Sequence, residues 1–129
     1  MSILNRADIF SAKDVTTETV SVPEWGHGAS VLVRGMTGRE RDGWESENVR
    51  VDEQGKVHLT RENSRARLCA RCIVDEAGAR LFNEADTSAL GEKCAAALDR
   101  IFDVAARLSG ISRSARGQAE KNSPTDPTA

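Results

Sequence analysis

Apolar residues recur at every second position in two short stretches near the start of the chain. Val20 and Val22 form the first stretch, and Val31 and Val33 form the second. A period of two is typical of β-strands that bury one face. Between the stretches, residues 23–28 contain one proline and two glycines, which suits a hairpin loop of about six residues. The pattern therefore predicts a β-hairpin.

The same period returns further along the chain. Val49 and Val51 precede a polar stretch, and Val57 and Leu59 follow it. The stretch itself, residues 52–55, ends in a glycine that can take the left-handed conformation of a tight turn. These residues predict a second hairpin with a polar tip. An extended, mobile loop is the alternative that the sequence leaves open.

Thr37 and Glu40 mark the start of the first predicted helix. A hydroxyl residue followed three positions later by glutamate is a capping box, in which each side chain bonds the other residue's backbone amide. We expect this helix to run to about residue 48. Gly43 weakens it by about 1 kcal/mol relative to alanine, so the helix is expected to depend on packing, through Trp44 in particular.

Residues 61–74 predict a second helix, with an apolar side and a basic side. The apolar positions are Ala66, Leu68, Cys69, Cys72 and Ile73. The arginines on the opposite side are Arg61, Arg65, Arg67 and Arg71. A polar stretch with glycine at 75–78 ends this helix, and 79–82 are expected to form a short strand or an extended segment. Asn83 or Ser88 is expected to cap the next helical segment.

The clearest helical pattern covers residues 91–109. Its apolar seam consists of Cys94, Leu98, Ile101, Ala105 and Leu108, at spacings of four, three, four and three. Phe102 widens the seam, which is typical of one face of an amphipathic helix. A helix of this length would span about 28 Å, and Gly110 is placed to end it.

Together these elements predict an α+β fold, in which small N-terminal β-hairpins pack with three or four helices. The last of these is a long C-terminal amphipathic helix. We expect residues 15–111 to form a single domain. Residues 1–14 are expected to be weakly ordered, with Ile3, Leu4, Ile9 and Phe10 available for docking. Residues 112–129 contain almost no apolar side chain, so they predict a disordered tail.

Composition narrows the classes of function. The net charge is −2 among 18 basic and 20 acidic residues, so bulk electrostatics do not favour a polyanion partner such as nucleic acid. No apolar run approaches the roughly 20 residues that a membrane helix needs, and polar residues interrupt any signal-peptide core near the N-terminus. Three cysteines are an odd count, which fits reduced thiols in a cytoplasm.

The sequence contains few motifs typical of catalytic or metal-binding sites. Phosphate-binding glycine loops, nucleophile elbows and histidine-glutamate zinc helices do not occur in the sequence. His27 and His58 both fall in predicted turns or hairpin arms, where polar side chains need no catalytic explanation. Cys69 and Cys72, together with Cys94 and a histidine, have the ligand types of a zinc site. Their helical apolar pattern favours buried core cysteines instead, and a disulfide is the third alternative.

Two further features are candidates for partner contacts. The arginines of 61–74 would suit phosphate groups, but they lack interleaved aromatic residues, so a solvated or ion-pairing helix face is favoured. Trp44 is interpreted as a core residue. Trp25 lies in a predicted turn, and an exposed tryptophan there would be a good anchor for a partner protein.

A series of short motifs runs along the chain, beginning with VSVPEWG at 20–26 and VLVRGMTGRERD at 31–42. It continues with RARL at 65–68, CIVDEAG at 72–78, LF at 81–82, LGEK at 90–93, LDRIF at 98–102 and RLSG at 107–110. With these motifs the chain resembles tail assembly chaperones of long-tailed phages that infect high-GC bacteria. The match spans about residues 15 to 122, and the order and spacing of the pieces carry it. The N-terminal segment and the cysteines depart from the family pattern.

This resemblance implies a function. Such chaperones bind the long, helical tape measure protein and keep it soluble while tail tube subunits polymerise around it. The resemblance therefore implies a protein of the host cytoplasm that is absent from the mature virion, with no catalytic residues and no cofactor. It implies tape measure protein as the partner, and self-association is compatible with it.

The family commonly makes a longer form by a −1 ribosomal frameshift. Glu120, Lys121 and Asn122 can be encoded GAA-AAA-AAC, which contains a slippery heptamer. The tail would then tether an extension that contacts the tail tube protein. Synonymous codons would remove the heptamer, and an ordinary frayed C-terminus explains the same polar tail.

A hypothesis for binding comes from the helices. An apolar helix of the tape measure protein would lie in a groove with Leu98, Ile101, Phe102 and Leu108 as its floor. Arg65, Arg67 and Arg71 would flank the groove, and Trp25 would add an anchor. Burial of the seam in the chain's own core is the competing interpretation. A head–tail connector or tail completion protein retained in the virion is the alternative function, a nucleic-acid-binding regulator is the third, and an enzyme is least favoured.

Overall fold

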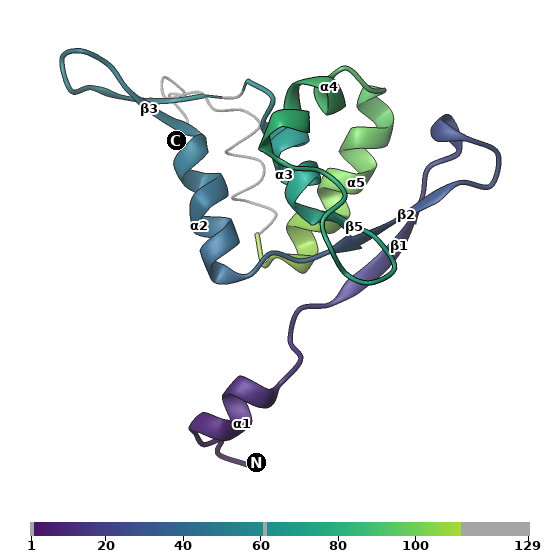
Figure 1. Ribbon diagram of the computed structural model, residues 1–129. Helices are drawn as coiled ribbons and strands as arrows, with labels where there is room; N and C mark the ends of the chain where they lie inside the picture. Colours follow the sequence, from purple (N-terminus) through teal and green to yellow (C-terminus); the bar gives the residue numbers. More distant parts are fainter. Residues whose placement is uncertain (1, 61, 112–129) are drawn as a thin grey trace, which may run out of the picture.

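The computed structural model describes residues 2–60 and 62–111, and it is the α+β fold that the sequence predicts (Figure 1). Three expectations lie outside the described residues. They are the helix start at Arg61, the disordered tail at 112–129 and the contribution of residues 120–122 to a frameshift site.

A three-stranded antiparallel sheet contains the first predicted hairpin. β1 is Thr17–Ser21 and β2 is Ser30–Arg34, with Val20 directly opposite Val31. A short 3-10 helix, η1 (Pro23–Trp25), occupies the connecting loop. The hairpin that the valine alternation predicts is confirmed.

The third strand corrects the interpretation of residues 61–74 as one helix. The helix α3 is Ser64–Cys72, and it is followed at once by β5, Ile73–Val74, which pairs with β2 on the edge opposite β1. Both residues of β5 are β-branched and buried, so they suit a pleated sheet covered on both faces. The extended segment expected at 79–82 is present, since Arg80 forms an antiparallel bridge with the second residue of β5.

Two predicted caps are present. The Thr37 hydroxyl accepts a hydrogen bond from the Glu40 amide at 3.2 Å, and the Glu40 carboxylate accepts one from the Thr37 amide at 2.9 Å, at the start of α2 (Gly38–Glu47). Asn83 caps the 3-10 helix η2 (Glu84–Asp86) with its side-chain oxygen. Local chemistry fixes both helix starts.

The helix predicted at 91–109 is shorter than expected. α4 is Thr87–Gly91, α5 is Ala95–Leu108, and a short non-helical break separates them. A Cβ added to Gly91 would lie 2.1 Å from the side-chain oxygen of Asn63, so the end of α4 packs directly on the loop before α3. Gly91 therefore has no room for a side chain, and the apolar seam of α5 gives no sign of the break that follows it.

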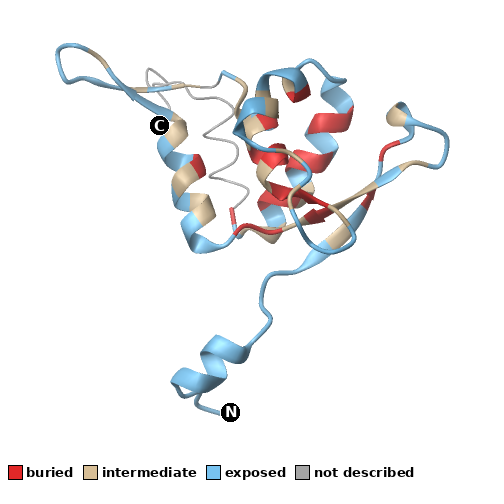
Figure 2. Ribbon diagram, viewed as in Figure 1, coloured by how far each residue is buried: buried red, intermediate tan, exposed pale blue. Residues whose placement is uncertain are grey.

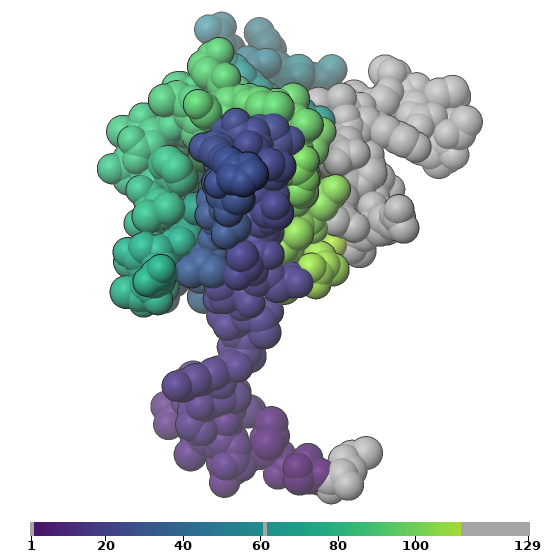
Figure 3. All heavy atoms as spheres, turned by 90° about the vertical axis from the view of Figure 1, so that its right-hand side faces the viewer, coloured from purple at the N-terminus to yellow at the C-terminus, as the bar shows by residue number. Residues whose placement is uncertain are grey.

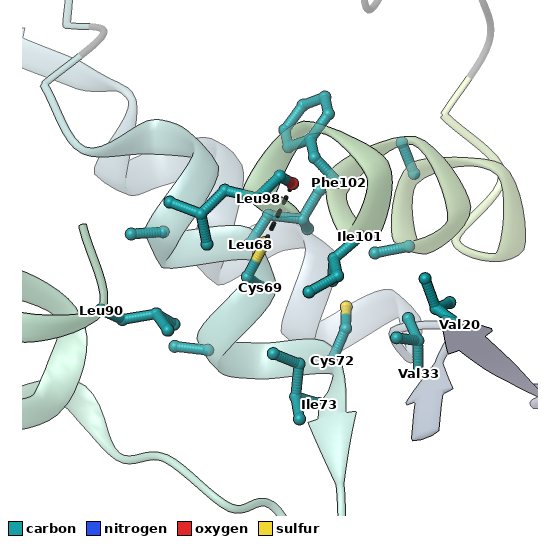
Figure 4. Packing of buried hydrophobic residues seen from close by; sticks show 14 of the residues in the cluster. Val20, Val33, Leu68, Cys69, Cys72, Ile73, Leu90, Leu98, Ile101 and Phe102 are labelled. Carbon is teal, nitrogen blue, oxygen red and sulfur yellow. Dashed lines mark hydrogen bonds between the residues drawn. The ribbon is translucent and has the colours of Figure 1, made fainter. Parts of the chain in front are cut away.

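The core lies between α3, α5 and one face of the three-stranded sheet (Figures 2 and 4). Its largest fully buried side chains are Val22, Val33, Leu68, Cys69, Cys72, Ile73 and Ile101. α2 contributes Trp44, whose ring lies 6.4 Å from that of Phe102. Full burial of one large apolar side chain contributes about 1.5–3 kcal/mol, so this cluster is the main source of stability.

A second, two-stranded sheet stands outside the core. β3 is Val49–Val51 and β4 is Val57–Leu59, and they pair antiparallel between α2 and α3 (Figure 1). Gly55 at the tip has a φ of 82°, the left-handed conformation that the sequence predicts. The structure therefore has the second hairpin and not the extended loop. We call residues 49–59 the ribbon.

The N-terminal residues form a second projection, at the bottom of the molecule in Figure 1. Within it, α1 (Arg6–Ser11) begins with a capping box between Asn5 and Asp8. Residues 1–14 are expected from their sequence to be weakly ordered, and α1 is not predicted. Residues 12–16 then lead into β1 without packing on the core, and α1 lies apart from the body of the fold (Figures 1 and 3). We call residues 2–16 the arm.

Candidate partner-binding surface

The ribbon has one apolar face that is open to solvent. Val49 lies opposite Leu59, and Val51 lies opposite Val57. Directly opposite residues share a face, and so do residues two apart on one strand, so all four side chains point to the same side. Val51 and Val57 are 61% and 60% exposed, and the other two are also exposed. The face therefore lacks cover within the described part of the chain.

The opposite face and the tip of the ribbon are polar. Asp52 accepts hydrogen bonds from the amides of Gln54 and Lys56 at 3.0 and 2.8 Å, and its other oxygen lies 2.8 Å from His58 Nε2. The hydrogen bond with His58, followed by those from the backbone, lowers the pKa of Asp52. These bonds tie the tip to β4, so the ribbon presents its apolar face in a folded, preorganised form.

The base of the ribbon is fastened to the helices on either side. The Thr60 amide donates to the carbonyl of Asn48 at 2.8 Å, which closes the ribbon at its base. Arg67 of α3 donates to the side-chain oxygen of Asn48 and to the carbonyl of Glu62. The predicted partner residue Arg67 thus holds the ribbon in place.

The arm carries the second group of exposed apolar side chains. They are Ile3, Leu4, Ile9, Phe10 and Val15. Phe10 is 73% exposed, and the guanidinium of Arg6 lies 4.8 Å from the centre of its ring. The exposure of Ile3, Leu4, Ile9 and Phe10 is compatible with the expectation that these four residues are available for docking.

The other two predicted arginines also contact the chain itself. Arg65 forms an ion pair with Asp99 of α5, and both side chains are half exposed. Arg71 is mostly buried between Glu47 of α2, with which it pairs, and Glu84 of η2, at 4.0 Å. Their partners come from elements distant in the sequence, which is why the helix pattern alone shows an unpaired basic face.

The predicted groove floor is part of the core. Leu98, Ile101 and Phe102 are buried against α3 and the sheet, and Leu108 is half buried (Figure 4). Residues of a closed core present no groove, so the seam of α5 does not form the expected partner surface in this structure. The burial agrees with the competing interpretation, and partner contact through these residues stays an untested prediction.

Trp25 is half buried and packs against the core. The neighbouring Glu24 accepts two hydrogen bonds from Arg100 of α5, at 2.9 and 2.8 Å, and Arg100 also donates to the carbonyl of Ser21 at 3.1 Å. The paired guanidinium lowers the pKa of Glu24 from 4.5 to about 2. The hairpin loop is thus clamped to α5, and Trp25 offers a partner only part of its surface.

The cysteines separate into two kinds. Cys69 and Cys72 are fully buried, as the core interpretation expects, and Cys69 donates to the carbonyl of Leu98 at 3.7 Å. Burial raises the pKa of both thiols, that of Cys72 to about 12. Cys94 is exposed just before α5, which corrects its assignment to the apolar seam.

Within the described residues, no three histidine, cysteine, aspartate or glutamate side chains are grouped so that they could hold a metal ion. None of the helices in this part of the chain is long and apolar enough to cross a membrane.

The surface that sequence reasoning missed is the apolar face of the ribbon. Its four residues predict the hairpin, but their pattern alone does not indicate a partner site. The sequence does contain a signal, because two apolar pairs alternate with Arg50 and His58 on strands that join two helices. Whether such a face is covered depends on tertiary structure.

Comparison with known proteins shows which fold and family the chain resembles. The solved structure of the bacteriophage HK97 tail assembly chaperone is similar to this chain, with a TM-score of 0.55 and 22% sequence identity, covering 79% of this chain and 94% of that one. At this identity, the likeness shows a shared fold. No curated protein sequence matches the chain.

The model of a family described as phage tail assembly chaperone matches residues 5–123. The expected restriction to phages of high-GC bacteria has no support in these comparisons. Since the family model spans the arm, the core and the ribbon, the chain belongs to the phage tail assembly chaperone family.

Proposed function

We propose that the chain binds apolar helical segments of the tape measure protein on the exposed face of the ribbon, and so keeps that protein soluble while the tail tube grows. The observation that carries this proposal is the apolar face of Val49, Val51, Val57 and Leu59, on an element that stands outside a complete core. Membership in the chaperone family supports the same conclusion.

The geometry of the ribbon suits an amphipathic helix. Opposite residues on two paired strands lie about 5 Å apart, and residues two apart on one strand lie about 7 Å apart. The four side chains therefore make a compact patch, which the apolar residues at positions i, i+3 or i+4, and i+7 of one helix can cover. The polar tip and the opposite face, which carries Arg50 and His58, stay in contact with water.

Weak binding at each site fits the task. Growth of the tail tube has to remove the chaperone, so each contact must be reversible. A dissociation constant in the micromolar range, about −8 kcal/mol, allows this removal. Many chaperone copies along one long tape measure protein would still cover its apolar surface, so high affinity per copy is unnecessary.

Other predicted contacts stay part of the proposal. Arg65 is the most exposed of the three predicted arginines, and a partner carboxylate can exchange with Asp99 for its guanidinium. An exchange of this kind affects association rate and register more than affinity. A −1 frameshift extension that contacts the tail tube protein, a location in the host cytoplasm and absence from the virion complete the proposal.

Copurification of tape measure fragments tests the ribbon. The variant carries Val51→Asp and Val57→Asp, which place two charges on the apolar face without touching the core. Leu81→Asp is the matched control, because Leu81 is 52% exposed on a different segment. We expect the ribbon variant to lose at least tenfold in affinity, about 1.4 kcal/mol, and the control to bind as the wild type does.

Two results would reject this assignment. One is a ribbon variant that binds the fragments as tightly as the wild type does. The other is that the fragments stay soluble alone and never copurify with the wild-type chain.

A further inference from the structure

The helix α2 is attached to the body by much less buried apolar surface than α3 and α5 are. Of its ten residues, Trp44 is buried and the rest are exposed or half buried (Figure 2). By contrast, five of the nine residues of α3 and six of the fourteen residues of α5 are buried. Since apolar burial is the main attraction between packed elements, it holds α2 least strongly of these three helices.

Polar contacts also attach α2 to the body. Arg71 of α3 is 13% exposed and pairs with Glu47 in the last turn of α2. Its guanidinium lies against Gly43, where an added Cβ would be 3.7 Å from Nη2. Near the start of α2, Glu40 accepts two hydrogen bonds from Arg34, at 3.0 and 2.7 Å. Charged groups regain water when they separate, so hydration offsets part of the attraction that is lost when α2 leaves the body.

α2 and the ribbon form one continuous unit. Asn48 follows α2 directly, and its carbonyl accepts a hydrogen bond from the Thr60 amide at the base of the ribbon. The ribbon extends from the end of α2 away from the body (Figure 1). The chain is fixed to the body before α2, where the Met36 amide donates to the Ser109 hydroxyl, and again at Asn63, whose side chain donates to a carbonyl of α4 at 3.4 Å. Movement of α2 between these two points therefore carries the ribbon with it.

The inner side of α2 carries a large apolar residue close to the ribbon in sequence. Trp44 precedes Val49, the first residue of the ribbon, by five positions. In the closed structure, the Trp44 ring lies 6.4 Å from that of Phe102 on α5. Separation of α2 from α5 would free this ring and leave it on the same unit as the apolar face of the ribbon. Tryptophan is among the residues that contribute most to binding at protein interfaces.

We propose that α2 opens from the body together with the ribbon, that the ion pair of Arg71 and Glu47 holds it closed, and that tape measure protein binds the open form. In the open form, Trp44 and the ribbon contact one amphipathic helix together. This inference rests on the proposed function. The closed form buries Trp44 while no partner is present. A partner that binds one of two states shifts the population toward that state, so binding and opening are coupled.

Native-state hydrogen exchange of the free, full-length chain tests the opening. A detached helix of ten residues is not stable in water, so the amides of α2 exchange whenever it separates from the body. We expect the amides in the interior of α2 to be protected about 100-fold less than those of α5, because α2 opens without global unfolding. Amides of α2 that exchange only together with those of α5 would overturn the inference.

Two variants break the ion pair from its two sides. Arg71→Met removes the charge and keeps an aliphatic side chain, and Glu47→Gln removes the partner charge on α2. We expect each variant to speed exchange in α2 about tenfold, since a hydrogen bond to a charged group contributes roughly that factor. Arg107→Met is the matched control, because Arg107 pairs with Glu18 of β1 and this pair stays intact when α2 opens. Wild-type exchange in α2 of both ion-pair variants would overturn the inference.

Calorimetric titration with tape measure fragments tests the coupling. Apparent affinity for a partner of the open form is proportional to the open fraction, so Arg71→Met and Glu47→Gln should each bind about tenfold more tightly than the wild type. Arg107→Met should bind as the wild type does. Equal or weaker binding by both ion-pair variants is the result of a merely structural ion pair, and it would overturn the inference. Absence of binding by the wild-type chain would reject the proposed function, while hydrogen exchange of the free chain still decides whether α2 opens.

Discussion

At Gly35, the end of β2 meets the end of α5 with no room for a side chain. A Cβ at this position would lie 2.4 Å from the backbone carbonyl oxygen of Leu108. The next residue completes the junction, because the Met36 amide donates to the Ser109 hydroxyl at 2.9 Å. The glycine is required here by close approach between two backbones, and its own φ is ordinary.

Replacement of Gly35 by alanine is therefore expected to lower the free energy of unfolding by about 1–3 kcal/mol, since a backbone has to shift to admit the methyl group. Urea denaturation measures this change. Gly38→Ala is the matched control, because a Cβ there meets nothing within 4 Å and the position is the first residue of α2. Equal stability of the two variants would show that β2 and α5 do not meet this closely.

The clamp between Glu24 and Arg100 makes a second prediction at this scale. The pKa of Glu24 is about 2 in the folded chain against 4.5 ordinarily, so its contribution to stability is fully present above pH 4.5. It is lost as the pH falls from 4.5 through 2, because the unfolded chain takes up the proton first. Glu24→Gln should lower stability at pH 7, and its difference from the wild type should shrink over this interval in acid denaturation. A difference that does not change with pH would contradict the clamp.

The burial of single residues could be predicted from the sequence, whereas their ion-pair partners could not. Burial of Cys69 and Cys72 follows from their place in a helical apolar pattern. The ion pairs of Arg65 and Arg71 could not be predicted, because their carboxylates come from α5 and from α2 and η2. Partners that only the tertiary fold brings near leave no spacing signal in the sequence.

At the scale of elements, structures with local causes were predictable. The capping box at Thr37 begins α2, and alternating apolar residues form both hairpins. β5 was missed because its two residues continue the apolar pattern of α3 and become a strand only beside β2. The break before α5 is not predicted either, because the apolar spacing continues across it, and the close packing of Gly91 on Asn63 is a tertiary contact without a local signal.

The stability of the ribbon can be tested separately from the stability of the core. Asp52→Ala removes the acceptor of two backbone amides and of His58 at the tip. We expect amide hydrogen exchange in β3 and β4 to become several-fold faster, while exchange in α5 is unchanged, because the ribbon opens independently of the core. Wild-type exchange rates in β3 and β4 would show that the tip does not hold the ribbon together.

At the scale of the whole molecule, the chain consists of a closed core with two apolar projections. The α+β class was predictable from periodicity, and the resemblance of residues 20–42 and later segments pointed to the family that the comparison shows. The partner surface was not predictable in the same way. The apolar side chains of α5 form the strongest pattern, and they are buried in the core. The apolar side chains of the ribbon form a weaker pattern, and they are exposed.

Mass spectrometry of purified particles separates an assembly factor from a structural component. A chaperone that tail tube growth removes is expected to be absent from mature virions and present in lysates of infected cells. Detection of the chain in stoichiometric amounts in purified virions would instead support a head–tail connector or tail completion protein. Tail tube protein, whose copies persist in the particle, provides the internal standard.

Site-specific photo-crosslinking during tail assembly tests the central claim most directly. A photoreactive residue replaces Val57 on the apolar face of the ribbon, or Asp103 on the exposed side of α5 as a position away from the ribbon. We expect a crosslink to tape measure protein from position 57 and none from position 103. Crosslinks from position 103 in place of position 57, or none to tape measure protein from either position, would contradict the claim that the ribbon holds this partner.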